Sequence, residues 1–272
     1  MRASSGSAST DRTLALLARL ASEPAGMTLQ QIAAELNVGK ATTYRSLRAL
    51  RTAGLVDQDE PRGQYRLGLG FLRMAFRYYE SWDEIASVRP SLDGIARATD
   101  ETAHYARLDG DQIVYLAKVS PPGEGLRSLS RVGGRANASS SGLGKSLLAQ
   151  ELLTLADVDN FIREHGPLIA RTDTTLTTAP SLHEELELTR RRGFATDNEE
   201  AEPGIVCIAF PLLLVGDTPT LRSVSVAAVA HRTPLRKLLT IAPVIRGILM
   251  ADYPGQVIEP NTRTAQQTDQ RA

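Results

Sequence analysis

The segment from Thr28 to Gly54 carries apolar residues at the spacing of two consecutive helices. Thr28 and Gln31 fit the capping box that opens the first helix. The buried stripe of that helix follows the i, i+3, i+4, i+7 spacing and comprises Leu29, Ile32, Ala33 and Leu36. Asn37 and Gly39, both able to adopt positive φ, mark a turn, and Gly54 ends the second helix. The pattern therefore predicts a helix-turn-helix.

The second helix has an apolar face and a basic face. At about 100° per residue, Thr43 and Leu50 fall close to Leu47 on the side that can pack on the first helix. The opposite side carries Thr42, Arg45, Arg48 and Ala49. No acidic residue occurs between Glu35 and Asp57. Small residues let such a face approach the major groove of DNA, and arginines pair with guanine edges or with phosphates.

Alternating apolar residues after the second helix predict two short strands. Val56 lies in the first strand, and Tyr65 and Leu67 lie in the second. The Pro-Arg-Gly turn between them places Arg62 at the tip of a hairpin, or wing. A generic helical hairpin with a solvated basic face is the alternative. The cap, the turn, the acid-free helix and the wing together favour binding to double-stranded DNA.

These features define the candidate DNA contacts. We expect Thr42 and Arg45 to reach base edges, and Lys40, Arg48 and Arg62 to hold phosphates. The complete candidate set is Lys40, Ala41, Thr42, Tyr44, Arg45, Arg48 and Arg62.

Periodicity and composition divide the chain into five segments. We expect a disordered tail over residues 1–9, a winged helix-turn-helix domain over 10–67, a linker helix over 68–82, an effector-binding domain over 83–253 and a flexible tail over 254–272. Thr10 or Asp11 can cap a first helix with Leu14, Leu17, Leu20 and Ala21 facing inward.

The expected linker helix has apolar residues at nearly heptad spacing. They are Leu69, Leu72, Phe76 and Tyr79. The helix could pack on its own domain, or it could connect the two domains and contribute to dimer contacts, which is the interpretation we favour.

The pattern after residue 83 predicts an α+β domain with a mostly antiparallel sheet. A first helix carries Pro90, which is expected to kink or interrupt it. Strand-like segments follow at 102–110, 112–120 and 125–133, the first two joined across Asp109-Gly110-Asp111. Helices are expected at 141–154, 157–165, 181–192 and 234–250, with three further strands between the last two.

Bulk properties narrow the function classes. The 31 basic and 31 acidic residues balance, so any attraction to DNA must come from local clustering. One cysteine excludes an intramolecular disulfide framework and fits a reducing cytoplasm. We find no secretory signal and no apolar run long enough to cross a membrane. The scattered histidines give no metal-ligand spacing, and we expect no metal and no cofactor.

Candidate chemistry in the second domain is limited. "GLGKS" lacks the earlier glycine of a phosphate loop, where Ser139 stands instead. Cys207 lies in an apolar strand and is more typical of a small core residue than of a nucleophile. Polar residues of "NASSSG", including Asn137, Ser139 and Ser141, precede a helix and could bind an anion or polar ligand. Asp197, Ser223 and Ser225 follow or lie on strands, although serines also fill loops and small core gaps.

At this point the chain resembles the IclR-type bacterial transcriptional regulators over about residues 12–252. The matching segments are "TLQQIAAELNVGKATTYRSLRALRTAGLV", "YRLGLGFL", "HYARLDGDQIVYLAKV", "RVGGRA", "GLGKSLLA", "RRRGFATDNEEAEPGIVCIAFPL" and "SVSVA". The Glu-Pro-Gly-x-x-Cys stretch after "RRGFATDNEE" is particularly specific.

The resemblance implies a winged helix-turn-helix, a linker helix and a GAF-like effector-binding domain. It implies a cytoplasmic dimer or dimer of dimers that binds a palindromic operator, and a small organic acid or aromatic effector in the second domain. By motif matching, the pocket positions are Gly142, Leu143, Asp197, Cys207, Ser223 and Ser225. Many relatives carry a His-Ala-Thr-Ala-like stretch where this chain has Ser139 to Gly142, so we expect a roomier and more polar cavity.

The sequence thus predicts a ligand-responsive DNA-binding regulator that represses transcription and is not an enzyme. Two other functions stay open at this stage. The second domain could be a small-molecule-binding enzyme with Cys207 as nucleophile, or the protein could be a sensor that acts through protein contacts alone.

Overall fold

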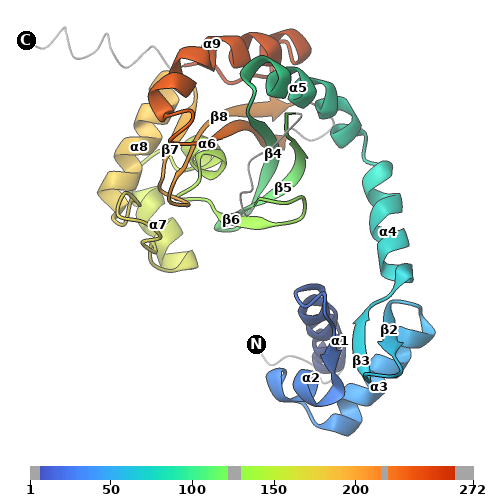
Figure 1. Ribbon diagram of the computed structural model, residues 1–272. Coiled ribbons are helices and arrows are strands. Elements are labelled where there is room, and N and C mark those ends of the chain that lie inside the picture. Colours follow the sequence, from blue (N-terminus) through green and yellow to red (C-terminus); the bar gives the residue numbers. More distant parts are fainter. Residues whose placement is uncertain (1–6, 122–129, 216–219, 261–272) are drawn as a thin grey trace, which may run out of the picture. The chain divides into compact units, whose positions relative to one another are not determined.

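The computed structural model describes residues 7–121, 130–215 and 220–260, and the chain divides between Asp83 and Glu84 into two compact units (Figure 1). Within those described ranges, every helix is too short or too polar to span a lipid bilayer.

The first unit is a winged helix-turn-helix. Its helices are α1 (Ser7–Ala21), α2 (Leu29–Glu35), α3 (Lys40–Thr52) and α4 (Leu69–Glu80). Its strands are β1 (Met27–Thr28), β2 (Val56–Asp59) and β3 (Gln64–Leu67), in the antiparallel order β1-β3-β2. β1 is an addition to the expected hairpin. The core includes Leu16, Leu20, Ile32, Leu47 and Tyr65.

Local signals around α2 and α3 act largely as the sequence predicts. Thr28 and Gln31 form the reciprocal capping box. Asn37 adopts a φ of 50° in the turn, and Gly54 a φ of 71° after α3. Gly39 departs from the expectation: its φ of −60° is ordinary, and it serves as the N-cap of α3 instead.

The inward face of α1 differs from the expected one. Leu16 and Leu20 are buried, whereas Leu14 is 58% exposed and Ala21 is exposed as well. The leucine run contains two overlapping stripes, and the i, i+4 pair Leu16 and Leu20 reaches the core. The helix also begins at Ser7, before the expected cap at Thr10 or Asp11.

The start of α4 is fixed against the turn after α3. The Gly70 amide donates to the Gly54 carbonyl at 3.0 Å. A Cβ atom on Gly70 would lie 2.4 Å from that oxygen, so only glycine permits this approach. Every residue of α4 is at least partly exposed in the structure described.

The second unit is an α+β domain built on a six-stranded antiparallel sheet. The strand order is β6-β5-β4-β9-β8-β7. The strands are β4 (Thr102–Asp109), β5 (Gln112–Val119), β6 (Arg135–Asn137), β7 (Ala195–Asn198), β8 (Ile205–Leu214) and β9 (Thr220–Val229). The helices are α5 (Asp83–Thr99), α6 (Gly142–Glu151), α7 (Leu155–His165), α8 (Ala179–Arg192) and α9 (Leu235–Asp252).

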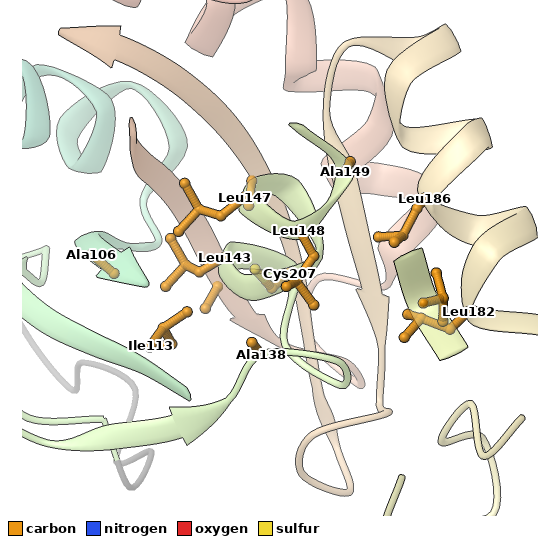
Figure 2. Close-up of a cluster of buried hydrophobic side chains, with 13 residues drawn as sticks. Ala106, Ile113, Ala138, Leu143, Leu147, Leu148, Ala149, Leu182, Leu186 and Cys207 are labelled. Carbon is orange, nitrogen blue, oxygen red and sulfur yellow. The ribbon is translucent and has the colours of Figure 1, made fainter. Parts of the chain in front are cut away.

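Helices cover both faces of this sheet. On one face α9 packs against β8, where Arg246 lies over the ring of Phe210, and the Ser91 hydroxyl donates to Asp252 between α5 and α9 at 2.6 Å. On the other face Leu143 and Leu147 of α6 pack into the main core cluster (Figure 2). α6 also packs on α8, so the domain is layered (Figure 1).

Three expectations for this unit need correction or further placement. Pro90 does not interrupt α5, which continues from Asp83 to Thr99. The strand expected over 125–133 falls largely outside the described residues, and 130–133 form no strand; β6 follows instead. Residues 254–260, expected in the flexible tail, include Val257, which is buried and bridges to Leu212 of β8.

The α1 correction supplies a matched test of the first core. Leu16→Ala should lower the free energy of unfolding of the N-terminal unit by about 2–5 kcal/mol, because it leaves a cavity at a buried site of α1. Leu14→Ala, the same substitution at an exposed position, should change it by about 0.5 kcal/mol or less. Denaturant unfolding monitored by circular dichroism measures both, and equal losses would contradict the observed helix face.

Candidate DNA-binding face and ligand cavity

The basic face of α3 is open to solvent. Lys40, Tyr44, Arg45 and Arg48 are exposed, as is Ala41, and Thr42 is half-buried. The opposite side buries Thr43, Leu47 and Leu50. Leucines therefore anchor the back of the helix and leave its arginines available to a ligand.

Hydrogen bonds orient the exposed arginines differently. Arg45 Nη2 donates to Thr42 Oγ1 at 3.2 Å, which keeps the guanidinium over the polar face. Arg51 instead donates to Gln58 Oε1 at 2.5 Å and lies 3.5 Å from Glu60 Oε1, on the wing side. Arg62 is exposed in the turn between β2 and β3. All seven candidate DNA contacts thus lie on α3 or on the wing.

The second unit encloses a cavity of about 220 Å³ beside the start of α6. Its inner wall comes from the turn before α6 and from β7, β8 and β9. Seven of the nine effector-binding candidates line it: Asn137, Ser141, Gly142, Leu143, Asp197, Cys207 and Ser225.

The other two candidates, Ser139 and Ser223, are absent from the described cavity lining. The Ser139 hydroxyl donates to Asn137 Oδ1 at 2.6 Å. Ser223 and Ser146 share a hydrogen bond of 2.6 Å between their hydroxyls. Both serines are buried and bonded within the protein, so their contribution is to the walls of the site.

A buried ion pair supports the Asp197 wall. Lys145 of α6 is fully buried, and its Nζ lies 2.5 Å from Glu200 Oε1. The Glu200 amide donates to Asp197 Oδ1 at 2.8 Å, and the Ala201 amide donates to the same oxygen at 3.4 Å. The lysine of "GLGKS" therefore fixes the turn after β7 and does not line the cavity.

Two glycines let α6 approach its surroundings. A Cβ atom on Gly142 would lie 2.8 Å from Cys207 Sγ of β8. A Cβ atom on Gly144 would lie 2.2 Å from the Ala138 backbone. Larger residues would push the helix away from the sheet or into the cavity.

The buried titratable groups of the cavity favour their neutral forms. Burial raises the pKa of Asp197 to about 7, opposed by the nearby Lys145 charge. Burial, with the Asp197 charge beside it, also raises the pKa of the Cys207 thiol. At neutral pH the thiol is protonated, and a protonated thiol is a poor nucleophile.

His104 and Tyr115 form a further wall that the sequence did not indicate. Their ring centroids lie 5.3 Å apart. Burial and the Lys118 charge lower the pKa of His104 to about 3, and its Nε2 bonds Ser130 Oγ at 2.9 Å. Ser140 also lines the cavity. The alternation of the strands only weakly indicates that the two rings face the cavity. Ser140 lies within the "NASSSG" stretch, but the sequence does not set it apart from its neighbours.

These features define a class of protein: a regulator with a DNA-binding winged helix-turn-helix and a separate domain that binds a small molecule. Two family models match the chain, "IclR helix-turn-helix domain" over residues 9–60 and "Bacterial transcriptional regulator IclR C-terminal" over residues 76–246. The chain belongs to the IclR family of bacterial transcriptional regulators.

Individual relatives agree with this assignment, and a solved structure agrees with the fold. The chain is 33% identical to the HTH-type transcriptional regulator BhcR of Paracoccus denitrificans, over 82% of this chain and 78% of that protein. It is 29% identical to the DNA-binding transcriptional repressor YiaJ of Escherichia coli, over 82% of this chain and 79% of that protein. The structure of an IclR homologue from Microbacterium hydrocarbonoxydans, complexed with 4-hydroxybenzoate, superposes with a TM-score of 0.68 at 20% identity, over 88% and 99%.

The matched families and relatives are transcriptional regulators and not enzymes, which agrees with the buried, protonated state of Cys207.

The ionisation of Asp197 can be measured directly. Carbon-detected NMR of the Asp197 carboxyl should show a transition near pH 7, with Asp197→Asn used to assign the signal. The pKa of an aspartate in an unfolded chain is about 3.9. The folded protein therefore binds the extra proton between about pH 4 and 7, and this group's contribution to stability falls as pH rises through that window. A transition near pH 4 would contradict the burial of this carboxyl.

Proposed function

We propose that this protein is a cytoplasmic repressor that binds a palindromic operator as a homodimer or a dimer of dimers. In this proposal a small organic acid or aromatic effector occupies the α6 cavity and alters operator binding. The observation that carries the proposal is the exposed, acid-free basic face of α3, held by leucines behind it.

Base recognition is assigned to Arg45 and Thr42. Their mutual hydrogen bond pre-orders the arginine fork on the face that would enter the major groove. Lys40, Arg48 and Arg62 are exposed and would hold phosphates.

Association of two chains is supported by α4. Its exposed large apolar side chains include Leu69, Leu72, Met74 and Phe76, the last 60% exposed. Contiguous exposed apolar residues usually mark an interaction surface. A second copy of α4 would cover them, and a two-fold dimer would match the symmetry of a palindromic site.

Regulation is assigned to the second domain. A ligand that binds one arrangement of the chains more tightly than another shifts the balance between them. Repression is supported by relatives named as repressors, including YiaJ. Seven of the nine effector-binding residues predicted from the sequence are in the cavity lining, five of them predicted by the family motif, and this supports the cavity as the effector site.

Band-shift titration with DNA from upstream of the protein's own gene and neighbouring genes tests this function. Arg45→Ala should weaken specific binding by about 1–3 kcal/mol, or about 5- to 150-fold. Arg51→Ala is the matched control, because Arg51 lies on the same helix but is bonded to Gln58.

The assignment of Arg45 to base recognition is supported if Arg51→Ala binds DNA like the wild type while Arg45→Ala, with the same helicity, binds it more weakly. Wild-type affinity in Arg45→Ala removes Arg45 from the interface. Absence of any DNA binding at low salt by the wild-type protein would refute the proposed function and favour a sensor that acts through protein contacts.

A further inference from the structure

Two serine hydroxyls in the α6 cavity are buried without a normal hydrogen bond. Ser140 Oγ and Ser225 Oγ have no partner of acceptable geometry, and each residue is 1% exposed. The Ser225 hydroxyl interacts with Cys207 and opposes the rise in the pKa of that thiol, but sulfur is a weak hydrogen-bonding group and the contact falls outside normal hydrogen-bond geometry. Buried polar atoms almost always have partners in native proteins, so two such groups in one cavity call for an explanation.

Neighbouring buried serines of the same domain do not share this property. Ser139 bonds Asn137, Ser141 accepts from the Gly144 amide at 3.1 Å, and Ser146 bonds both Leu143 O and Ser223. Ser139, Ser146 and Ser223 lie outside the described lining. Among the described buried serines, the two left unsatisfied both border the cavity, which points to a partner from the ligand. The Thr189 hydroxyl of α8 also lacks a partner but lies outside the lining.

The rest of the lining is mixed, with apolar residues such as Leu143, Ile205 and Ala227 beside polar ones. Asp197 lines the cavity, and its two backbone hydrogen bonds both use Oδ1, so Oδ2 is not engaged by them. Among the described lining residues, Tyr115 alone carries a benzene ring. A cavity of about 220 Å³ is smaller than the roughly 300–1,000 Å³ typical of larger ligands.

We propose that the cavity is built for a small aliphatic ligand that bears several hydroxyl groups, with Ser140 and Ser225 as the residues that select for them. This inference rests on the proposed effector role of the cavity and specifies its ligand class. A site whose polar groups are satisfied only by ligand hydroxyls discriminates against an analogue without them, because binding that analogue leaves the serines and Asp197 unpaired. An aromatic ligand would place ring carbons against these hydroxyls and leave them without a hydrogen-bond partner.

Matched acids separate hydroxyl recognition from charge and chain length. D-gluconate and hexanoate share six carbons and one carboxylate, and glycerate and propionate share three carbons. Isothermal titration of the full chain at constant pH should show that the hydroxylated member of at least one pair binds about tenfold or more tightly than its deoxy partner. 4-Hydroxybenzoate serves as the aromatic probe.

The variants provide the internal controls. Ser140→Ala and Ser225→Ala should each reduce the preference for the hydroxylated acid about fivefold or more, without lowering the midpoint of thermal unfolding of the ligand-free protein. Ser139→Ala removes a neighbouring hydroxyl that is satisfied by Asn137; it should lower that midpoint but leave the preference unchanged.

Tighter binding of hexanoate, propionate or 4-hydroxybenzoate than of the hydroxylated acids would overturn the inference. So would an unchanged preference in both Ser140→Ala and Ser225→Ala, or the absence of binding by both hydroxylated acids at millimolar concentration. A band shift with the same preparation tells these failures apart from failure of the proposed function, since DNA binding by the wild type would persist in each case.

Discussion

The cavity depends on a buried ion pair between two segments that are distant in the sequence. Lys145 lies near the start of α6, and Glu200 lies in the turn after β7, 55 residues later. Breaking a buried pair of this kind costs about 3–5 kcal/mol, because the remaining charge loses its partner in a medium of low polarity. The pair holds the turn whose amides bind Asp197, and it fixes the start of α6 beside Cys207. The ligand wall is therefore a consequence of charge burial as well as of packing.

The ion pair also extends beyond the cavity. Glu185 of α8 lies 3.9 Å from Lys145 Nζ and accepts a hydrogen bond of 2.6 Å from Arg192. Arg192 ends α8, where Gly193 adopts a φ of 73°. This network connects the wall that holds Asp197 to the C-terminal end of α8. The N-terminal unit is built differently, on a helix that leucines anchor from behind and whose charged face is exposed.

The sequence predicts the first unit well because its determinants are local. The capping box at Thr28, the stripe on α3 and the turn at Arg62 each lie within one short segment. The cavity depends on strand order, which brings Asp197, Cys207 and Ser225 together from three strands. Periodicity does not reveal that order, so these residues were predicted as neighbours only from the resemblance to the family. Neither method distinguished Ser139 from Ser140, because adjacent turn residues face different surroundings. The burial of Lys145 could not be predicted either, because a lysine is usually exposed to solvent and its partner Glu200 lies far along the chain.

Hydrogen exchange measured by NMR on the Lys145→Met variant tests this account most directly. The Glu200 and Ala201 amides should exchange much faster than in the wild type, because the turn that offers them to Asp197 has lost its anchor. Amides in the centre of β9, such as that of Val226, should keep their protection if the sheet is intact. Unchanged protection at Glu200 and Ala201 would contradict the claim that the Lys145–Glu200 pair holds the cavity wall.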